Sequence, residues 1–238
     1  MLPGFSAIIP AYNEAERIGD TLRQVIDYLR VSSPESELIV VDDGSTDATS
    51  DRVRDGFNRA DSIETHLIHR SPNHGKGYAV RTGLLAASRP VGLFLDADLS
   101  TPIEETPKLL EPIFAGELDV AFGSRALNRT LIGNRQAWHR EQGGRVFNLL
   151  VRVATGLPYW DTQCGFKAFR LDVFRPILEQ ARNDGFSFDV ELLYLAHHAG
   201  LRMREIPVRW NHCEGSKVSF LRDSLRMLRE VIALRTGR

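Results

Sequence analysis

The first half of the chain alternates short apolar runs with amphipathic segments, which predicts buried strands separated by helices with one buried face. Strands are expected at residues 6–10, 38–41, 65–68, 91–95 and 120–122. Helices are expected at residues 18–29, at 76–87 and after the turn at 42–45, where Ser45 or Thr46 is the expected N-terminal cap. This alternation predicts an α/β domain with a mostly parallel sheet and helices on both faces.

The second half of the chain has a less regular pattern. Residues 123–145 are rich in Arg, Asn, Gly and Gln, which indicates a loop. Helices are expected at residues 145–154 and 188–199, and strands at 163–169 and 204–210. We find no internal repeat and no linker, so the pattern predicts one domain.

Composition and charge narrow the class of protein. The chain has 238 residues, 42% of them hydrophobic, and a formal net charge of -1, which is typical of a soluble globular protein and gives no indication of a nucleic-acid partner. Two cysteines are too few for a disulfide framework and favour a reducing compartment. The sequence contains no signal peptide and no apolar run of ~18 residues, so we expect a cytoplasmic protein without a membrane span. The sequence leaves the oligomeric state open.

Acidic and polar side chains follow three of the predicted strands. They lie at residues 10–14 (PAYNE), at Asp42 and Asp43, and at Asp96 and Asp98. Ligands of open α/β sheets bind outside the carboxyl ends of the strands, so we expect these residues to form one site.

Asp96 and Asp98 are the strongest candidates for chemistry. In an extended backbone their side chains point to the same side, where two carboxylates suit Mg²⁺ or Mn²⁺. The alternative is that Asp98 caps the turn before Pro102 while Asp96 is solvated. Lys76, in the sequence HGKG, matches no complete phosphate-loop motif. It either neutralises a phosphate near a helix N-terminus or is a solvated lysine in a turn.

Seven motifs occur in order along the chain: IIPAYNEAERI, VVDDGSTDAT, NHGKGYAVRTG, LDADLSTP, FGSR, DTQCGFKAF and FDVELL. With these motifs the chain resembles family-2 glycosyltransferases of the polyprenyl-phosphate hexose synthase kind, from about residue 5 to residue 220. The later motifs, together with EGSK at 214–217, are most similar to dolichyl-phosphate β-glucosyltransferases and next to dolichyl-phosphate mannose synthases.

The resemblance implies a single GT-A domain over residues 1–238, with a nucleotide-sugar half at 1–122 and an acceptor half at 123–216. It also implies a divalent metal, Mg²⁺ or Mn²⁺, and inverting transfer of a hexose to a polyprenyl or dolichyl phosphate. Glucose from UDP-glucose is the expected donor sugar, and GDP-mannose is the alternative donor.

The same resemblance assigns roles to individual residues. It places the nucleotide sugar against Pro10, Tyr12, Glu14, Val41, Asp43, Lys76, Asp96 and Ala97. Asp98 would coordinate the metal, with Asp96 beside it, and Ser100 stands where mannose synthases carry a further ligand, a glutamine. Arg125 and Arg140 match arginines near the acceptor phosphate, and Lys217 matches a basic loop that closes over the site.

The acceptor decides whether a base is needed. A lipid phosphate is ionised near neutral pH, since its second pKa is ~6, and attacks without a general base. A sugar hydroxyl would need one. Asp189 and Glu191 are the candidates, unless they serve only to stabilise the first turn of their helix.

Residues 217–238 form a predicted amphipathic helix with a basic edge. Such a helix either lies in a membrane interface, which would give peripheral membrane contact, or packs on the catalytic domain. Three other functions remain open: transfer to a soluble acceptor, nucleotidyl transfer and non-catalytic nucleotide binding. The PAYNE sequence in place of a Gly-rich basic loop disfavours nucleotidyl transfer, and the intact acid pair disfavours a non-catalytic module.

Overall fold

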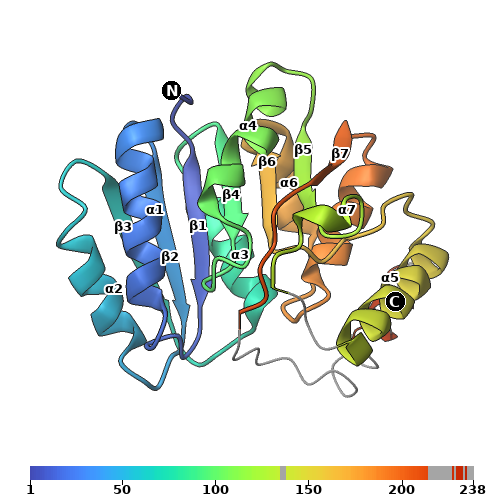
Figure 1. Ribbon diagram of the computed structural model, residues 1–238, viewed down its shortest axis with the longest axis horizontal. Coiled ribbons are helices and arrows are strands. Elements are labelled where there is room, and N and C mark those ends of the chain that lie inside the picture. The colour runs from blue at the N-terminus through green and yellow to red at the C-terminus, as the bar shows by residue number, and fades with distance from the viewer. Residues whose placement is uncertain (135–137, 214–226, 228, 233, 235–238) are drawn as a thin grey trace.

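The computed structural model describes residues 1–134, 138–213, 227, 229–232 and 234, and for residues 138–141 the backbone only. Seven strands form one sheet in the order β3-β2-β1-β4-β6-β5-β7 (Figure 1). Their bounds are β1 Ser6–Ala11, β2 Glu37–Asp43, β3 Glu64–Arg70, β4 Val91–Leu95, β5 Val120–Ser124, β6 Phe166–Arg170 and β7 Met203–Pro207. Only β6 runs antiparallel to its neighbours among these strands, so the predicted mostly parallel sheet is confirmed.

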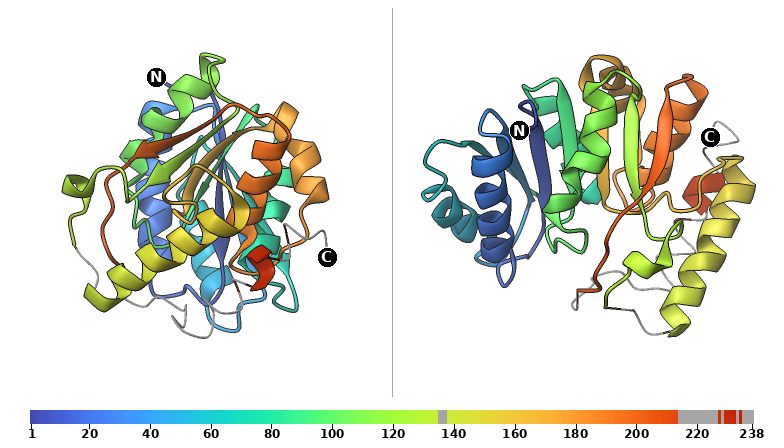
Figure 2. Two further views of the ribbon diagram at one scale, coloured as in Figure 1. Left: turned by 90° about the vertical axis from the view of Figure 1, so that its right-hand side faces the viewer. Right: turned by 45° about the horizontal axis from the view of Figure 1, so that its top comes forward.

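Helices cover both faces of the sheet, as predicted (Figure 2). They are α1 Ile18–Ser32, α2 Thr49–Phe57, α3 Lys76–Ala86, α4 Thr106–Phe114, α5 Trp138–Thr155, α6 Leu171–Gln180 and α7 Phe188–His198, with short 3-10 turns at Ile103–Glu105 and Arg129–Leu131. One apolar core holds the buried side chains of α1, α2 and α4, and a second core on the other face holds those of α3, α6 and α7.

Several sequence expectations were wrong in detail. The helices α4 and α6 were not predicted; each contains an internal proline, Pro112 or Pro176, which removes a backbone hydrogen bond, and packing of their buried apolar faces compensates. The expected loop at 123–145 gives way to α5 at Trp138. The strand expected at 163–169 begins only at Phe166, and the strand expected at 204–210 ends at Pro207.

The predicted cap of α2 was also wrong. Helix α2 begins at Thr49, and neither Ser45 nor Thr46 caps it. Both bind Asn13 in the loop after β1 instead: Asn13 N donates to Ser45 Oγ at 2.8 Å, and Thr46 N donates to Asn13 Oδ1 at 2.8 Å. These two hydrogen bonds join the loops that follow β1 and β2.

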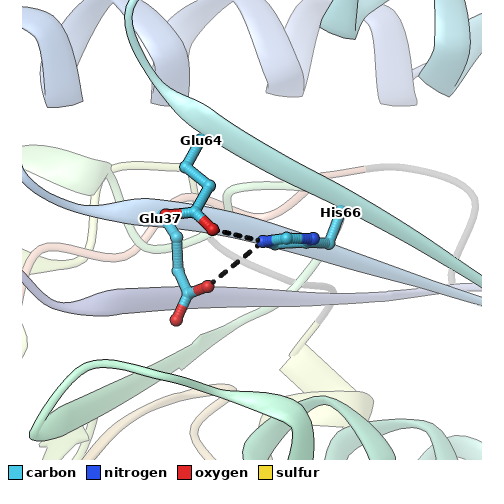
Figure 3. Close-up of side chains that lie close together, drawn as sticks. All are labelled: Glu37, Glu64 and His66. Atoms are coloured by element: carbon cyan, nitrogen blue, oxygen red, sulfur yellow. Dashed lines mark hydrogen bonds and ion pairs between the residues drawn. The ribbon is translucent and has the colours of Figure 1, made fainter.

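A carboxylate–histidine cluster lies at the amino ends of the strands, away from the loops just described. Figure 3 shows His66 Nε2 between Glu64 Oε1 at 3.0 Å and Glu37 Oε2 at 3.4 Å. Glu37 is 1% exposed, and its Oε1 accepts hydrogen bonds from Ser6 and from the backbone and side chain of Ser88. Arg89 pairs with Glu64 at 2.7 Å. Because every acid in the cluster already has a donor, we interpret it as a structural ion-pair network.

Glu37→Gln is expected to cost about 1–2 kcal/mol of unfolding free energy at neutral pH, because it weakens buried charge-assisted hydrogen bonds. Burial opposes the charged form, but hydrogen bonds from Ser6 and Ser88 hold the pKa of Glu37 below its ordinary 4.5. A lowered pKa in the folded state stabilises the fold above pH 4.5 and loses that contribution as the pH falls further. Urea denaturation should therefore show the wild-type advantage shrinking below pH 4.5; an advantage that does not change with pH would contradict this explanation.

Candidate active site

A pocket of about 800 Å³ opens at the carboxyl ends of β1, β2 and β4. It brings together eight of the residues that the sequence assigned to the nucleotide sugar or the metal: Pro10, Tyr12, Glu14, Asp43, Lys76, Asp96, Ala97 and Asp98. These residues come from four segments that are distant in sequence. The parallel strands carry them to one edge of the sheet, as expected for an open α/β fold.

Asp43 shapes one wall of the pocket. Its carboxylate is 2% exposed and accepts backbone hydrogen bonds from His74 at 3.0 Å and Gly75 at 2.7 Å. Gly75 has a φ of 117°, a backbone conformation that favours glycine, and it directly precedes α3. Asp43 therefore holds the loop that delivers Lys76 to the pocket.

Asp96 and Asp98 lie in a turn and not in an extended segment, so the premise used to place them together was wrong. Leu99 N donates to Asp96 O at 3.1 Å, and Leu99 has a φ of 46°. Both acids nevertheless line the pocket. Ser100 N donates to Asp98 Oδ1 at 2.9 Å, so part of the turn-capping alternative is also present.

The two acids have different surroundings. Asp96 Oδ1 lies 2.6 Å from Lys76 Nζ. Burial opposes the charged amine, but Asp96 and Asp189 outweigh burial and raise the pKa of Lys76. Within the described part of the chain, Asp98 forms no ion pair with a lysine or arginine. Asp98 is thus the acid whose charge is left to bind a cation.

The lining side chains carry an excess of negative charge. Among described residues, the acids are Glu14, Asp43, Asp96, Asp98, Asp184 and Glu230, and the bases are Arg17, Lys76 and Arg182, so six acids against three bases leave a formal charge of -3. A nucleoside diphosphate is itself an anion and would be repelled by this charge. A divalent cation at Asp98 would offset it, and carboxylate oxygens are the ligands that Mg²⁺ and Mn²⁺ prefer. The residues present therefore fit the implied metal.

A second buried pair lies under the pocket. Lys167 is 0% exposed and its Nζ lies 2.5 Å from Asp189 Oδ1. The same amine donates to Cys164 O at 2.5 Å. Burial raises the pKa of Asp189, against the opposing effect of Lys167. Asp189 is 4% exposed and is not among the residues that line the pocket.

Arg125 lies apart from the pocket. Its Nε lies 2.7 Å from Asp161 Oδ2 and one terminal nitrogen lies 2.7 Å from Asp161 Oδ1, which forms a two-pronged ion pair. Burial of Asp161 opposes its charged form, but Arg125 lowers the pKa of Asp161. The role of Arg125 at an acceptor phosphate stays a prediction.

Four other assigned residues are not brought to the pocket wall by the described structure. Val41 is 0% exposed, with its side chain in the core beneath α3, and its contact with a base stays a prediction. Ser100 is 8% exposed and its backbone amide is occupied by Asp98, which leaves the third-ligand assignment a prediction. The side chain of Arg140 and the whole of Lys217 lie outside the described residues, as does most of the predicted helix at 217–238.

One wall of the pocket was not predicted from the sequence. It consists of the loop before α7, residues 182–186, with Met227 and Glu230. Arg182 N and Asn183 N donate to the buried Glu191 carboxylate, at 3.0 Å and 2.7 Å, which holds this loop in place. The only signal was local: the Arg-Asn-Asp-Gly run between two apolar segments. Nothing in that run indicates which edge of the sheet it will reach.

Gly165→Ala is expected to reduce activity by about tenfold or more, since positioning errors near 1 Å carry large catalytic costs. A Cβ at Gly165 would lie 1.9 Å from Asp96 Oδ2, and Gly165 O accepts the Asp96 amide at 3.1 Å. The methyl group would displace the Asp96 carboxylate and so disturb its pair with Lys76. Steady-state rates with a thermal-melting control would test this; Gly116→Ala, which meets nothing within 4 Å, is a control for substitution of glycine, although its φ of 73° adds strain. Wild-type rates in Gly165→Ala would contradict the expectation.

Comparisons with known proteins identify the family of this chain. The family model described as glycosyl transferase family 2 matches residues 6–178. The dolichyl-phosphate β-glucosyltransferase of Drosophila melanogaster is 36% identical over 242 residues, which cover 96% of this chain and 73% of the relative. That of Dictyostelium discoideum is 30% identical and covers 97% of this chain and 73% of the relative. Glycosyltransferase AglD of Haloferax volcanii is 32% identical over 95% of this chain and 36% of its own length.

Solved structures share the fold. Glucosyl-3-phosphoglycerate synthase from Mycobacterium tuberculosis, in complex with Mn²⁺ and UDP-glucose, superposes with a TM-score of 0.69 at 20% identity, over 98% of this chain and 78% of that chain. Its complex with Mn²⁺, UDP and glucosyl-3-phosphoglycerate gives 0.67 at 22% identity, over 98% and 79%. At this level of identity the likeness confirms the predicted GT-A architecture.

Proposed function

Because this chain belongs to glycosyl transferase family 2, we propose that it transfers glucose from UDP-glucose to a polyprenyl or dolichyl phosphate, with inversion at the anomeric carbon. The observation that carries the proposal is the pocket in which Asp98 stands beside the Lys76–Asp96 pair at the carboxyl ends of the strands. The choice of glucose and of a lipid phosphate rests on the names of the relatives, which are dolichyl-phosphate β-glucosyltransferases with 30% and 36% identity.

Different residues of the pocket would contact different parts of the donor. Pro10, Tyr12, Glu14 and Asp43 line the part nearest β1 and β2 and would hold the nucleoside. Asp98 would hold Mg²⁺ or Mn²⁺, which as a Lewis acid stabilises the charge of the departing nucleoside diphosphate. Lys76 would contribute positive charge to the same diphosphate, while its pair with Asp96 fixes its position.

The structure favours a phosphate acceptor over a sugar hydroxyl. A hydroxyl acceptor needs a base in contact with it. Asp189 is buried, paired with Lys167 and absent from the pocket lining, and Glu191 is 5% exposed and accepts hydrogen bonds from residues 182 and 183. A lipid phosphate needs no such base, since it is already ionised. Arg125 and Arg140 stay the proposed contacts of that phosphate.

We place the reaction at the cytoplasmic face of a membrane, because the proposed acceptor is a lipid. Among the helices within the described residues, none has both the length and the apolar character to cross a bilayer. We propose that contact with the lipid is peripheral.

Radiolabel transfer into solvent-extractable lipid tests the proposal. Purified protein would receive UDP-glucose or GDP-mannose, a short polyprenyl phosphate and Mg²⁺. We expect lipid label from UDP-glucose, lost on chelation of the metal. Label from GDP-mannose alone would make the protein a mannosyltransferase, and no lipid label despite metal-dependent nucleotide binding would exclude the lipid-phosphate acceptor.

A further inference from the structure

Helix α5 has an apolar face that the rest of the described protein does not cover. Four of its side chains are exposed: Val146 at 59%, Leu149 at 55%, Leu150 at 42% and Val153 at 69%. Their spacing of three, four and seven residues places them on one stripe of the helix. We call this set the α5 stripe.

The α5 stripe is not the face by which the helix attaches to the domain. Phe147 and Val151, which are 8% and 0% exposed, pack on Val190, Met227 and Val231. Helix α5 is therefore apolar on two sides, and only one of them is used in the fold. Soluble proteins rarely leave several neighbouring apolar side chains exposed to water. The four exposed side chains of the α5 stripe therefore indicate a surface that docks on a partner.

The charged side chains beside the α5 stripe indicate which kind of partner docks on it. Helix α5 itself, residues 138–155, contains three arginines and one glutamate, a formal charge of +2 in a chain whose net charge is -1. Successive helical residues are about 100° apart, which puts Arg145 and Arg152 within about 60° of Leu149, along one edge of the stripe. Trp160 is 52% exposed, and the Arg152 guanidinium lies 3.7 Å from the centre of its ring.

We propose that the α5 stripe inserts into the interface of an anionic lipid bilayer. Apolar side chains bordered by arginines and an aromatic ring are the combination that binds such interfaces. A second copy of the chain would bring the arginines that border the two stripes together, which disfavours a symmetric dimer through this face. Figure 1 and Figure 2 show α5 at the outer edge of the molecule, at the end of the sheet opposite to β3, where a flat surface can reach it.

The position of α5 connects the membrane to the pocket. Met227 packs against the buried face of α5 and also lines the pocket. A bilayer at the α5 stripe would therefore be separated from this wall of the donor site by the thickness of α5, about 10 Å. The inference rests on the proposed function in one respect: a lipid acceptor gives the enzyme a reason to bind membranes.

Vesicle sedimentation tests the inference without any transfer reaction. The full chain would be mixed with vesicles of phosphatidylcholine containing phosphatidylglycerol, and with vesicles of phosphatidylcholine alone. We expect binding to the anionic vesicles that weakens with added salt, and a fall of about tenfold or more in the partition coefficient for Leu149→Gln with Val153→Gln. Val31→Gln is the matched control, since Val31 is 77% exposed at the end of α1 and should bind as wild type does.

Two further readouts separate this inference from the proposed function. Binding of UDP in the presence of Mg²⁺ should be equal in wild type and the double variant, which also shows that the variant is folded; if it is not, the single Val153→Gln variant replaces it. Wild-type protein that stays in the supernatant, vesicle binding that the variants do not reduce, or self-association that they abolish would each overturn the membrane assignment. Vesicle binding with no glucosyl transfer would contradict the proposed function but would still support the α5 stripe as a membrane-binding surface.

Discussion

Asp98→Asn is expected to lower kcat/KM for glucosyl transfer by on the order of a hundredfold or more. The substitution removes a negative charge from the one acid of the pair that Lys76 does not neutralise. The side-chain oxygen of asparagine can still accept the hydrogen bond from Ser100 N, so the turn should keep its shape. Initial rates with UDP-glucose, and titration of UDP binding with and without Mg²⁺, would show the loss as a loss of the metal-dependent part of the affinity.

A matched control is Asp172→Asn, on α6, whose carboxylate pairs with Arg170 and is 71% exposed. It makes the same change in charge and should leave rates and metal dependence as they are in wild type. A metal requirement that survives Asp98→Asn would mean that the ion is held by other ligands, and the assignment of Asp98 would be wrong.

Lys167→Met is expected to have the largest effect on stability, about 3–5 kcal/mol of unfolding free energy, because it leaves a buried charge without its partner. Methionine matches the length of the lysine, so loss of packing is small. The double variant Lys167→Met with Asp189→Leu should recover most of the loss, since it removes both charges. Arg23→Met is the control: its side chain and that of its partner Asp20 are 61% and 76% exposed, and an exposed pair contributes about 0–1 kcal/mol.

The same variant should depend on pH in a defined direction. Burial already raises the pKa of Asp189 above its ordinary 3.8, and loss of Lys167 removes the charge that opposes this shift. A raised pKa in the folded state gives stability at low pH that is lost as the pH rises through it. Denaturation curves should therefore show the deficit of Lys167→Met shrinking as the pH is lowered toward 3.8. A deficit that is equal at all pH values would indicate a packing defect in place of an unpaired carboxylate.

The candidate site could be predicted in part because strand ends carry a readable pattern. Asp43, Asp96 and Asp98 follow continuous apolar runs, and parallel strands bring such ends together whatever the loops do. Contacts with neighbours distant in sequence could not be predicted in this way. The side chain of Val41, two residues before Asp43 in the same strand, packs in the core beneath α3, and its contact with a base stays a prediction. The loop at 182–186 reaches the pocket through the Glu191 carboxylate, which no local pattern reveals.

The partners of charged residues could not be read from the sequence. Asp189 had the position of a candidate base at the start of a helix, but the fold places it beside Lys167, 22 positions earlier in the chain. Arg125 had the position of a phosphate ligand, and the fold pairs it with Asp161. Ion pairs form between whichever charges packing brings within a few ångströms, and packing is a property of the assembled sheet.

The local pattern of apolar and polar residues was sufficient for the class of fold, for most strands and helices and for the edge of the sheet that carries the acids. These properties follow from short-range periodicity and from the geometry of parallel strands. The pairing of Asp96 with Lys76, the charge of -3 on the described side chains that line the pocket and the uncovered face of α5 required the folded chain. Each of them depends on distances between residues that lie far apart in the sequence, and those distances exist only once the sheet and its two helical layers have packed together.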